Sequence, residues 1–442
     1  MADILNELSQ IIECQDRPDP ELIKRHNIKL GLRNEDGSGV NVGLTGKGKV
    51  IGYVKDETGR KVDVPGELYY CGIDITDLAT HHSPGRGYEE TAFLLLTGVL
   101  PTKAQLDAFA DYLASRRNLP MHFRNELTDI VNDNLMNSLE IAVCSLYGED
   151  PAPDSTRIKD VTRHSIDLIA TFPALVSCAY HAMQYKYHGQ SLNLVNPIMT
   201  GSHAENFLHM FRAGAAYTAE EIRLMDLFLI LHAEHGGGNN STFTVRAVSS
   251  SETDTFSAIT AGLASLKGHL HGGANEQVMA MFARLKTSIK DWKDSDEVAN
   301  YLRRVLRKQE GDGSGKLYGI GHAVYTLSDP RTTILKDVIR SMAVSRGRLD
   351  EFELLTLVGE LGPGLVEEAK PGKKVAPNVD FYSGFMLDCL SIPVEVYTPL
   401  FAMSRVAGWC AHRLEQLVQN RLIRPAYTNA APKRAYVPLD KR

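Results

Sequence analysis

Residues 219–242, "AEEIRLMDLFLILHAEHGGGNNST", contain the segment that decides the fold class. As far as His235 this segment is apolar almost all round, which predicts a helix buried inside the protein rather than one lying on its surface. Three glycines follow and end the helix at once. From about residue 74 to 310 the same Ala- and Leu-rich pattern recurs, with apolar residues at i, i+3 and i+4. We therefore predict a mainly α fold.

Other stretches support this prediction and add one exception. Residues 88–117, "YEETAFLLLTGVLPTKAQLDAFADYLASRR", predict two helices broken at Gly98 and Pro101. Residues 328–360 also have helical spacing. The exception is a short β-like region over residues 38–72, where "VNVGLTG", "KVIGYVKD" and "GELYYCGI" are separated by glycines and "DETGR".

Proline and glycine interrupt the helical pattern near the N-terminus and in two later stretches. Residues 3 to about 28 have helical spacing that "RPDPE" interrupts, and Pro20 suits the first position of a second helix. The stretches most broken by glycine and proline are "GDGSGKLYGIGHAVY" at 311–325 and "LGPGLVEEAKPGKKVAPNVD" at 361–380. We expect loops at both.

Composition excludes several classes of protein. The chain has 442 residues, a net charge of −6 and 23% charged residues, without the basic excess of a nucleic-acid-binding protein. We find no uninterrupted apolar run of the length that a membrane span needs, and no secretory or mitochondrial targeting pattern at the N-terminus. The six cysteines are scattered and none forms CxxC, so we expect free thiols and a cytoplasmic protein.

Two motifs suggest a cofactor, and neither fits well. "GLTGKGKV" at 43–50 nearly matches a P-loop, but Val50 replaces the hydroxyl that binds magnesium, and a strand pattern follows where a helix is required. "HAEH" at 232–235 spaces its histidines three apart, whereas zinc proteases use HExxH. A metal site, two packed core histidines and a substrate-binding turn remain open for this motif.

Histidine beside glycine then recurs along the chain. His271 precedes two glycines in "GHLHGGANE", and His322 follows Gly321 in "YGIGHAVYTLSDPR". Asp380 ends a Pro/Gly loop in "APNVDFYSG". These pieces suggest one assembled site with three histidines and one carboxylate, because glycines allow backbone and ligand to approach closely.

The ordered set of motifs resembles the citrate synthase family over nearly the whole chain from residue 66. It comprises "GELYYCGIDITDLA", "YEETAFLLLTGVLPT", "ENFLHMF", "LHAEHGGGNNSTFTVR", "LKGHLHGGANEQVM", "GIGHAVYTLSDPR", "PNVDFYSG", "LFAMSRVAGW" and "IRPAYTNA". The resemblance implies that acetyl-CoA is condensed with oxaloacetate and that the resulting thioester is hydrolysed to citrate and CoA. A 2-methylcitrate synthase, which uses propionyl-CoA, is the nearest alternative. A non-catalytic paralogue and a zinc hydrolase are poorer ones.

The resemblance also implies roles for particular residues. Asp380 matches the catalytic base, His271 the neutral donor to the enol, and His322 the group that polarises the oxaloacetate carbonyl. It implies no tightly bound cofactor and no metal.

Substrate-binding residues follow from the same resemblance. Arg331, Arg405 and Arg424 match arginines that bind the oxaloacetate carboxylates, where a planar fork suits a carboxylate better than a lysine does. His235 assists them, and Asn239 is a supporting contact. Lys373 and Lys374 are candidates for the CoA phosphates. Two residues depart from many members, in which arginine stands at the positions of Cys71 and Ala323.

The family fold implies a helical homodimer of two-domain subunits. Residues 1–271 would form a large domain with an N-terminal extension over about 1–72, residues 272–379 a small domain, and residues 380–442 the return to the large domain and the C-terminal tail. Arg424 would reach the active site of the partner subunit.

Overall fold

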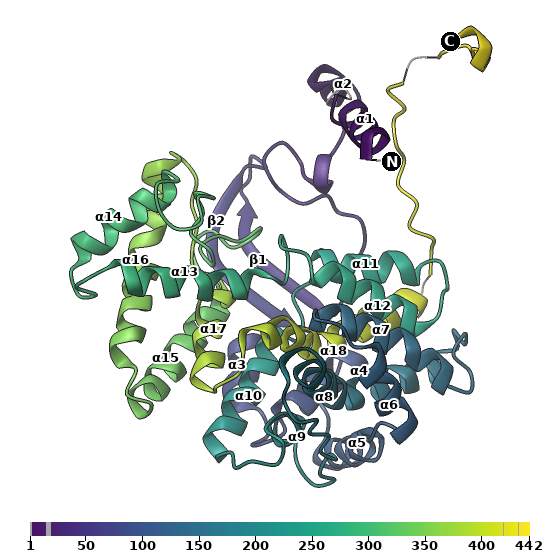
Figure 1. Ribbon diagram of the computed structural model, residues 1–442, viewed down its shortest axis with the longest axis vertical. Helices are drawn as coiled ribbons and strands as arrows, with labels where there is room; N and C mark the ends of the chain where they lie inside the picture. The colour runs from purple at the N-terminus through teal and green to yellow at the C-terminus, as the bar shows by residue number, and fades with distance from the viewer. Residues whose placement is uncertain (1, 15–18, 419, 432) are drawn as a thin grey trace. The chain divides into compact units, whose positions relative to one another are not determined.

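The computed structural model describes residues 2–14, 19–418, 420–431 and 433–442 (Figure 1). The chain forms two compact units. The smaller unit comprises Met1–Gly43 and Ile423–Arg442, and the larger unit comprises Leu44–Leu422. All candidate site residues except Arg424 belong to the larger unit.

The smaller unit contains short helices joined by irregular chain. Helix α1 spans Ala2–Glu13 and helix α2 spans Pro20–Arg25. Pro20 stands at the start of α2, as predicted, and the Asp19 side chain caps it by accepting the N–H of Glu21 at 2.8 Å. The remaining elements are the 3-10 turns η1 (Leu30–Leu32) and η4 (Leu439–Lys441).

The larger unit begins with a small antiparallel sheet in the order β1-β2-β3. Its strands are β1 (Gly48–Lys55), β2 (Lys61–Tyr70) and β3 (Ile73–Asp74), and "DETGR" forms the turn between the first two. The prediction of a strand at "VNVGLTG" was wrong, since residues 40–46 have no strand structure. Leu44 is 93% exposed, so this run lacks the buried face that holds a strand in a sheet.

Helices make up most of the larger unit, as the apolar periodicity predicts. They are α3 (Ile75–His81), α4 (Gly87–Thr97), α5 (Lys103–Arg116), α6 (Met121–Ile130), α7 (Leu135–Ser145), α8 (Ile158–His188), α9 (His203–Phe211), α10 (Ala219–His232), α11 (Asn240–Ser249), α12 (Thr255–Leu266), α13 (Ala274–Ser288), α14 (Ser295–Leu306), α15 (Pro330–Ser345), α16 (Leu349–Ala369), α17 (Val379–Cys389) and α18 (Tyr397–Val418), with the 3-10 turns η2 (Leu146–Glu149) and η3 (Val394–Val396). The predicted break at Gly98 and Pro101 separates α4 from α5.

Helix α18 lies at the centre of the core. It packs against α4, α8, α10, α11 and α12, and nearly all its side chains are buried. Helix α10 is buried along most of its length, as predicted for "AEEIRLMDLFLILH". Helix α8 is long and apolar enough to cross a membrane by length and composition alone, but 78% of its most apolar window is buried among its neighbours. In this chain it is a core helix.

Helices α13 to α17 form a second group, in which α14 packs on α16, and α17 packs on α13, α15 and α16 (Figure 1). The predicted domain boundaries at residues 272 and 380 stay predictions. The expected loop over 361–369 was wrong, because α16 continues through Pro363 to Ala369. A Cβ atom on Gly362 would collide with Ile320, so this glycine permits close packing within the helix.

Candidate active site

The turn after α10 is held by its own polar groups. Gly236 adopts φ +76°, a left-handed conformation that favours glycine. The Asn239 side chain caps α11: its oxygen accepts the N–H of Thr242 at 3.0 Å, and its nitrogen donates to the carbonyl of Gly236 at 2.6 Å. Asn239 therefore uses both ends of its amide within the turn, and acts on any ligand through the shape of the turn.

The two histidines of "HAEH" face different surroundings. His232 is fully buried, stacks on Phe228 at 4.1 Å between ring centroids, and donates from Nδ1 to the Phe228 carbonyl at 2.8 Å. The His235 ring lies 5.0 Å from that of His322 and 5.5 Å from that of Tyr325. Among the described residues, no group of three or more His, Cys, Asp or Glu side chains is placed to hold a metal ion.

His322 is oriented by its own loop. Gly321, with φ +125°, sets the backbone direction before it. The backbone N–H groups of Val324 and Tyr325 donate to His322 Nδ1 at 3.0 and 3.1 Å. A nitrogen that accepts cannot carry the proton, so the neutral imidazole is protonated on Nε2. Tyr325 stacks on the same ring at 4.7 Å.

A second loop runs beside that of His322. Ile320 pairs with Pro377, the N–H of Gly321 donates to the Ala376 carbonyl at 2.8 Å, and Asn378 Nδ2 donates to the Gly321 carbonyl at 2.8 Å. Lys373 and Lys374 are exposed on this loop, so both candidate CoA lysines belong to the loop that pairs with the histidine loop.

His271 occupies a tight turn before α13 and contacts the first turn of α11. The backbone N–H of Ser241 donates to His271 Nε2 at 3.2 Å, and Ser241 Oγ lies 2.9 Å from the same nitrogen. Trp409 Nε1 donates to that hydroxyl at 3.2 Å. Burial, together with the charge of Arg405, lowers the pKa of His271 to about 4. The imidazole is therefore neutral at pH 7, with its proton on Nδ1.

Asp380 lies in the first turn of α17, where the Asn378 side chain accepts its backbone N–H at 3.0 Å. Its Oδ1 is buried and has no hydrogen-bond partner among the described residues. Burial raises the pKa of Asp380 to about 6, although the charges of Arg331 and Arg405 act in the opposite direction. The carboxyl is thus ionised at neutral pH and basic enough to take up a proton.

Arg331 is buried and already paired. Its Nε and Nη2 donate to the Asp329 carboxylate at 3.0 and 2.7 Å, and Asp329 Oδ2 also accepts the N–H of Val379 at 3.2 Å. This carboxylate, which caps α15, fixes Arg331 relative to the start of α17 and hence to Asp380. Asp329 thus occupies the Nε and Nη2 edge of the Arg331 guanidinium, and the Nη1 side is left for a ligand.

Arg405 is 1% exposed on α18. Its Nε donates to the His232 carbonyl at 2.8 Å, and its guanidinium lies 4.8 Å from the centre of the Phe401 ring. Burial lowers the pKa of Arg405 to about 10, and the charge of Glu234 opposes this shift. A buried cation held in this way is suited to bind a carboxylate.

The structure brings most of the predicted site residues together. Burial lowers the pKa of His235 well below its ordinary value, and Arg331, His322, Arg405 and His271 all add to the shift. Arg424 is exposed and belongs to the smaller unit.

Sequence reasoning missed three residues of this site: Asp329, Ser241 and Tyr325. Only Asp329 left a signal, because an aspartate before a proline is typical of a helix start.

Comparisons with known proteins identify the family. The family described as "Citrate synthase, C-terminal domain" matches residues 43–426. The chain is 35% identical to the citrate synthase of Haloferax volcanii, over 85% of this chain and 93% of that protein. It is 34% identical to the 2-methylcitrate synthase of Shewanella oneidensis, over 90% of this chain and 98% of that protein.

Solved structures show the same fold. The citrate synthase of Thermoplasma acidophilum, in a ternary complex with carboxymethyl coenzyme A and oxaloacetate, superposes with a TM-score of 0.76 at 28% identity, covering 94% of this chain and 99% of that one. The citrate synthase of Pyrobaculum aerophilum superposes with a TM-score of 0.74 at 31% identity, covering 92% and 94%. The chain belongs to the citrate synthase family.

Proposed function

We propose that this enzyme condenses acetyl-CoA with oxaloacetate and hydrolyses the citryl thioester to citrate and CoA. One observation carries the proposal. Two buried polar atoms, His235 Nε2 and Asp380 Oδ1, lack hydrogen-bond partners among the described residues, and the buried cations Arg331 and Arg405 act on both groups. Leaving such atoms unpaired costs about 1–3 kcal/mol each, so a polar, anionic ligand is favoured.

Oxaloacetate fits these groups because it carries two carboxylates. Arg331 would bind one of them through Nη1, since Asp329 occupies the other edge of its guanidinium. Arg405 and His235 would bind the substrate from the side of the turn. The ternary complex of the Thermoplasma relative holds oxaloacetate and a coenzyme A analogue together, which supports the same pair of ligands here.

The acid and base groups suit the condensation. Asp380 takes a proton from the acetyl methyl group while the Nδ1–H of neutral His271 donates to the thioester oxygen, and the enol forms. The enol carbon then attacks the oxaloacetate carbonyl carbon, which the Nε2–H of His322 polarises, and the new alkoxide takes that proton. Water cleaves the thioester and releases CoA. These groups supply all the acid–base chemistry, so the reaction needs no bound metal or cofactor.

The CoA moiety would lie along the paired loops at 319–322 and 372–378. Lys373 and Lys374 are exposed there and would contact its phosphates. Because phosphate contacts of surface lysines are screened by salt, the KM for acetyl-CoA should rise with ionic strength.

The proposal includes a homodimer in which Arg424 completes the active site of the partner subunit. Helix α18 continues from Arg405 to Val418, a distance of about 20 Å at 1.5 Å per residue. To reach the Arg405 site of its own subunit, the chain from 419 to 424 would have to return almost fully extended. Contribution to a second subunit avoids this requirement.

A CoA-release assay with oxaloacetate tests the function directly. We expect acetyl-CoA to give the higher kcat/KM, and propionyl-CoA to be the poorer substrate. The reverse order would identify a 2-methylcitrate synthase, as two relatives of similar identity are named. One methyl group discriminates by only about 1–3 kcal/mol, so both thioesters must be measured. No release with either would refute the proposal.

A further inference from the structure

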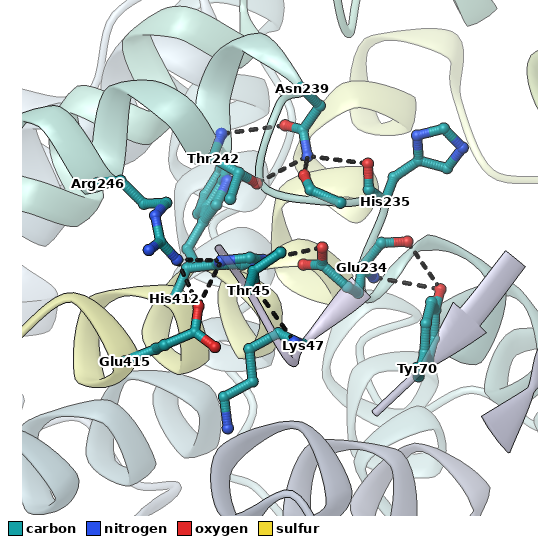
Figure 2. Close-up of polar contacts among 12 residues, drawn as sticks. Thr45, Lys47, Tyr70, Glu234, His235, Asn239, Thr242, Arg246, His412 and Glu415 are labelled. Atoms are coloured by element: carbon teal, nitrogen blue, oxygen red, sulfur yellow. Dashed lines mark hydrogen bonds and ion pairs between the residues drawn. The ribbon is translucent and has the colours of Figure 1, made fainter. Parts of the chain in front are cut away.

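A buried chain of polar residues lies directly behind the substrate-binding turn (Figure 2). Glu234, the residue before His235, is fully buried, and its Oε1 accepts from His412 Nε2 at 2.9 Å. His412 Nδ1 accepts from Arg246 Nη1 at 2.9 Å, and the same nitrogen of Arg246 binds Glu415 at 2.5 Å. The reaction chemistry uses none of these four residues.

One face of α18 contacts the turn that follows α10. Arg405, Gly408, His412 and Glu415 follow one another at helical spacing and therefore lie on one side of the helix. Arg405 binds the His232 carbonyl, and His412 binds the Glu234 side chain. A Cβ atom on Gly408 would lie 2.5 Å from Glu234 Oε2, so the helix and the turn are in close contact.

The backbone of Glu234 is fixed as well. Tyr70 Oη donates to the Glu234 carbonyl at 2.9 Å and accepts the Glu234 N–H at 3.2 Å. A Cβ atom on Gly48 would lie 2.5 Å from Glu234 Oε1, so strand β1 closes the other side. Neighbouring residues therefore hold both the main chain and the side chain of Glu234.

The charges along this chain alternate. An arginine can only donate, so His412 Nδ1 is unprotonated and the neutral ring donates from Nε2 to Glu234. The order is then Glu415 negative, Arg246 positive, His412 neutral and Glu234 negative, with Arg405 positive beyond. Burial raises the pKa of Glu234, but the hydrogen bond from His412 and the charge of Arg405 outweigh the effect of burial and hold the pKa below its ordinary value, so the carboxyl is ionised.

At the other end of this series of polar residues, Glu415 and Arg246 bind the main chain of the segment that precedes β1. Glu415 Oε1 accepts the N–H of Gly46 at 2.8 Å, and Arg246 Nη2 donates to the Leu44 carbonyl at 3.4 Å. The contacts therefore run without interruption from the main chain at 44–46 to the residue beside His235.

Stability alone is a weak reason for such a chain. Buried ion pairs repay their desolvation poorly, and apolar replacements are often neutral or stabilising. A fully buried carboxylate whose Oε2 has no hydrogen-bond partner among the described residues is less favourable still. These polar contacts instead hold the turn that contains Glu234 and His235 in one position relative to α18.

We propose that Glu234, held through His412 by Arg246, is a positioning residue that fixes His235 and Arg405 relative to each other for binding of oxaloacetate. This inference rests on the substrate-binding roles proposed above for His235 and Arg405. Glu234 does not touch the substrate; it acts through the turn and through the face of α18.

A simple electrostatic role predicts the opposite sign. If Glu234 acted only as a nearby negative charge, removing it would strengthen binding of a dianion, because like charges repel. If it positions the turn, removing it weakens binding although the repulsion is relieved. The direction in which the KM for oxaloacetate changes therefore distinguishes the two roles.

The experiment compares Glu234→Gln with wild type in steady-state kinetics and thermal unfolding. We expect the KM for oxaloacetate to rise about tenfold, the scale of one lost charge-assisted hydrogen bond. Both kcat at saturating oxaloacetate and the KM for acetyl-CoA should change much less. An unchanged or lower KM for oxaloacetate would overturn the proposal, whatever happens to Tm.

A second pair of variants tests the relay if Glu234→Gln does not fold. His412→Gln keeps a donor near the position of Nε2, whereas His412→Asn keeps polarity only near Nδ1. We expect His412→Asn to raise the KM for oxaloacetate severalfold more than His412→Gln does. Equal KM values in the two variants would refute the relay.

Asp150→Asn is the matched control. Asp150 pairs with the fully buried His164 at 3.1 Å and with Arg163, so it offers the same residue types away from the substrate turn. It should lower Tm and leave the KM for oxaloacetate unchanged; a rise equal to that of Glu234→Gln would overturn the proposal as a general effect of loosening. Wild-type turnover is measured alongside. An inactive wild type contradicts the proposed function itself, whereas an active wild type with an unaffected Glu234→Gln contradicts only the positioning role.

Discussion

The backbone N–H of Ser241 donates to His271 Nε2 over 3.2 Å, and this contact decides which nitrogen of the imidazole carries its proton. Since a backbone N–H can only donate, Nε2 must accept, and the neutral ring presents Nδ1–H. His322 is fixed in the opposite sense, because two backbone N–H groups donate to its Nδ1. Two neutral histidines thus offer donors from different ring positions.

The tautomer of His271 leads to the first prediction. An asparagine amide nitrogen overlays Nδ1 of histidine, whereas a glutamine amide nitrogen overlays Nε2. His271→Gln should lower kcat by about 10²–10³, the usual effect of losing a donor to a developing oxyanion, and His271→Asn should lose about tenfold less. Steady-state assays of the two purified variants check this. The reverse order would show that Nε2 is the donor.

Asp380→Asn gives the second prediction. The variant keeps the shape of the side chain and removes the base, so turnover should fall by about 10²–10⁴ while oxaloacetate binding is largely retained. In the wild type, the pKa of about 6 predicts that kcat/KM falls as the pH drops below 6, because the base must be ionised. Turnover near the wild-type level in Asp380→Asn would contradict its assignment as the base.

The third prediction is that the same carboxylate destabilises the fold. The pKa of Asp380 is raised on folding from its ordinary value of 3.8, so ionisation costs more in the folded protein than in the unfolded chain. Its stabilising protonated form is present below pH 4 and is lost as the pH rises through about 6. Asp380→Asn should therefore have a higher Tm than wild type at pH 8, and the difference should disappear near pH 4. Differential scanning calorimetry at both pH values measures this, and an equal Tm at pH 8 would count against the raised pKa.

The sequence predicted the helical core for identifiable reasons. All-round apolar character predicted α10, and the Gly98–Pro101 break separated α4 from α5. The failures occurred where tertiary contacts override local preference. Residues 40–46 look like a strand but form none, and α16 continues through Pro363 to Ala369, with Gly362 packed against Ile320.

For the candidate site, the motifs and the family resemblance named the residues but did not indicate how they are held. Asp329 accepts hydrogen bonds from one edge of the Arg331 guanidinium, and this contact depends on where α15 begins. The histidine tautomers depend on backbone N–H groups that a linear pattern does not locate. The chain from Glu234 to Glu415 joins residues about 180 positions apart, which no local spacing indicates.

Metal removal gives the fourth prediction. Because the proposed mechanism assigns the proton transfers to Asp380, His271 and His322, exhaustive EDTA treatment should leave CoA release unchanged. The assay is repeated after adding back zinc or magnesium. Activity that disappears with EDTA and returns with zinc would support the metal hypothesis for "HAEH", in spite of the separate surroundings of His232 and His235.

The last prediction concerns Arg424 and the proposed dimer. Asp380→Asn and Arg424→Ala should each be inactive alone. If Arg424 serves the partner subunit, a mixed dimer of the two variants has one site with both lesions and one site with none. Unfolding the two variants together and refolding them at equal concentrations should then restore about a quarter of the wild-type activity, since half the dimers are mixed and half of their sites are intact. Wild type carried through the same refolding provides the reference. If Arg424 instead acts within its own subunit, every site in the mixture carries one lesion, and the refolded sample stays as inactive as its parents.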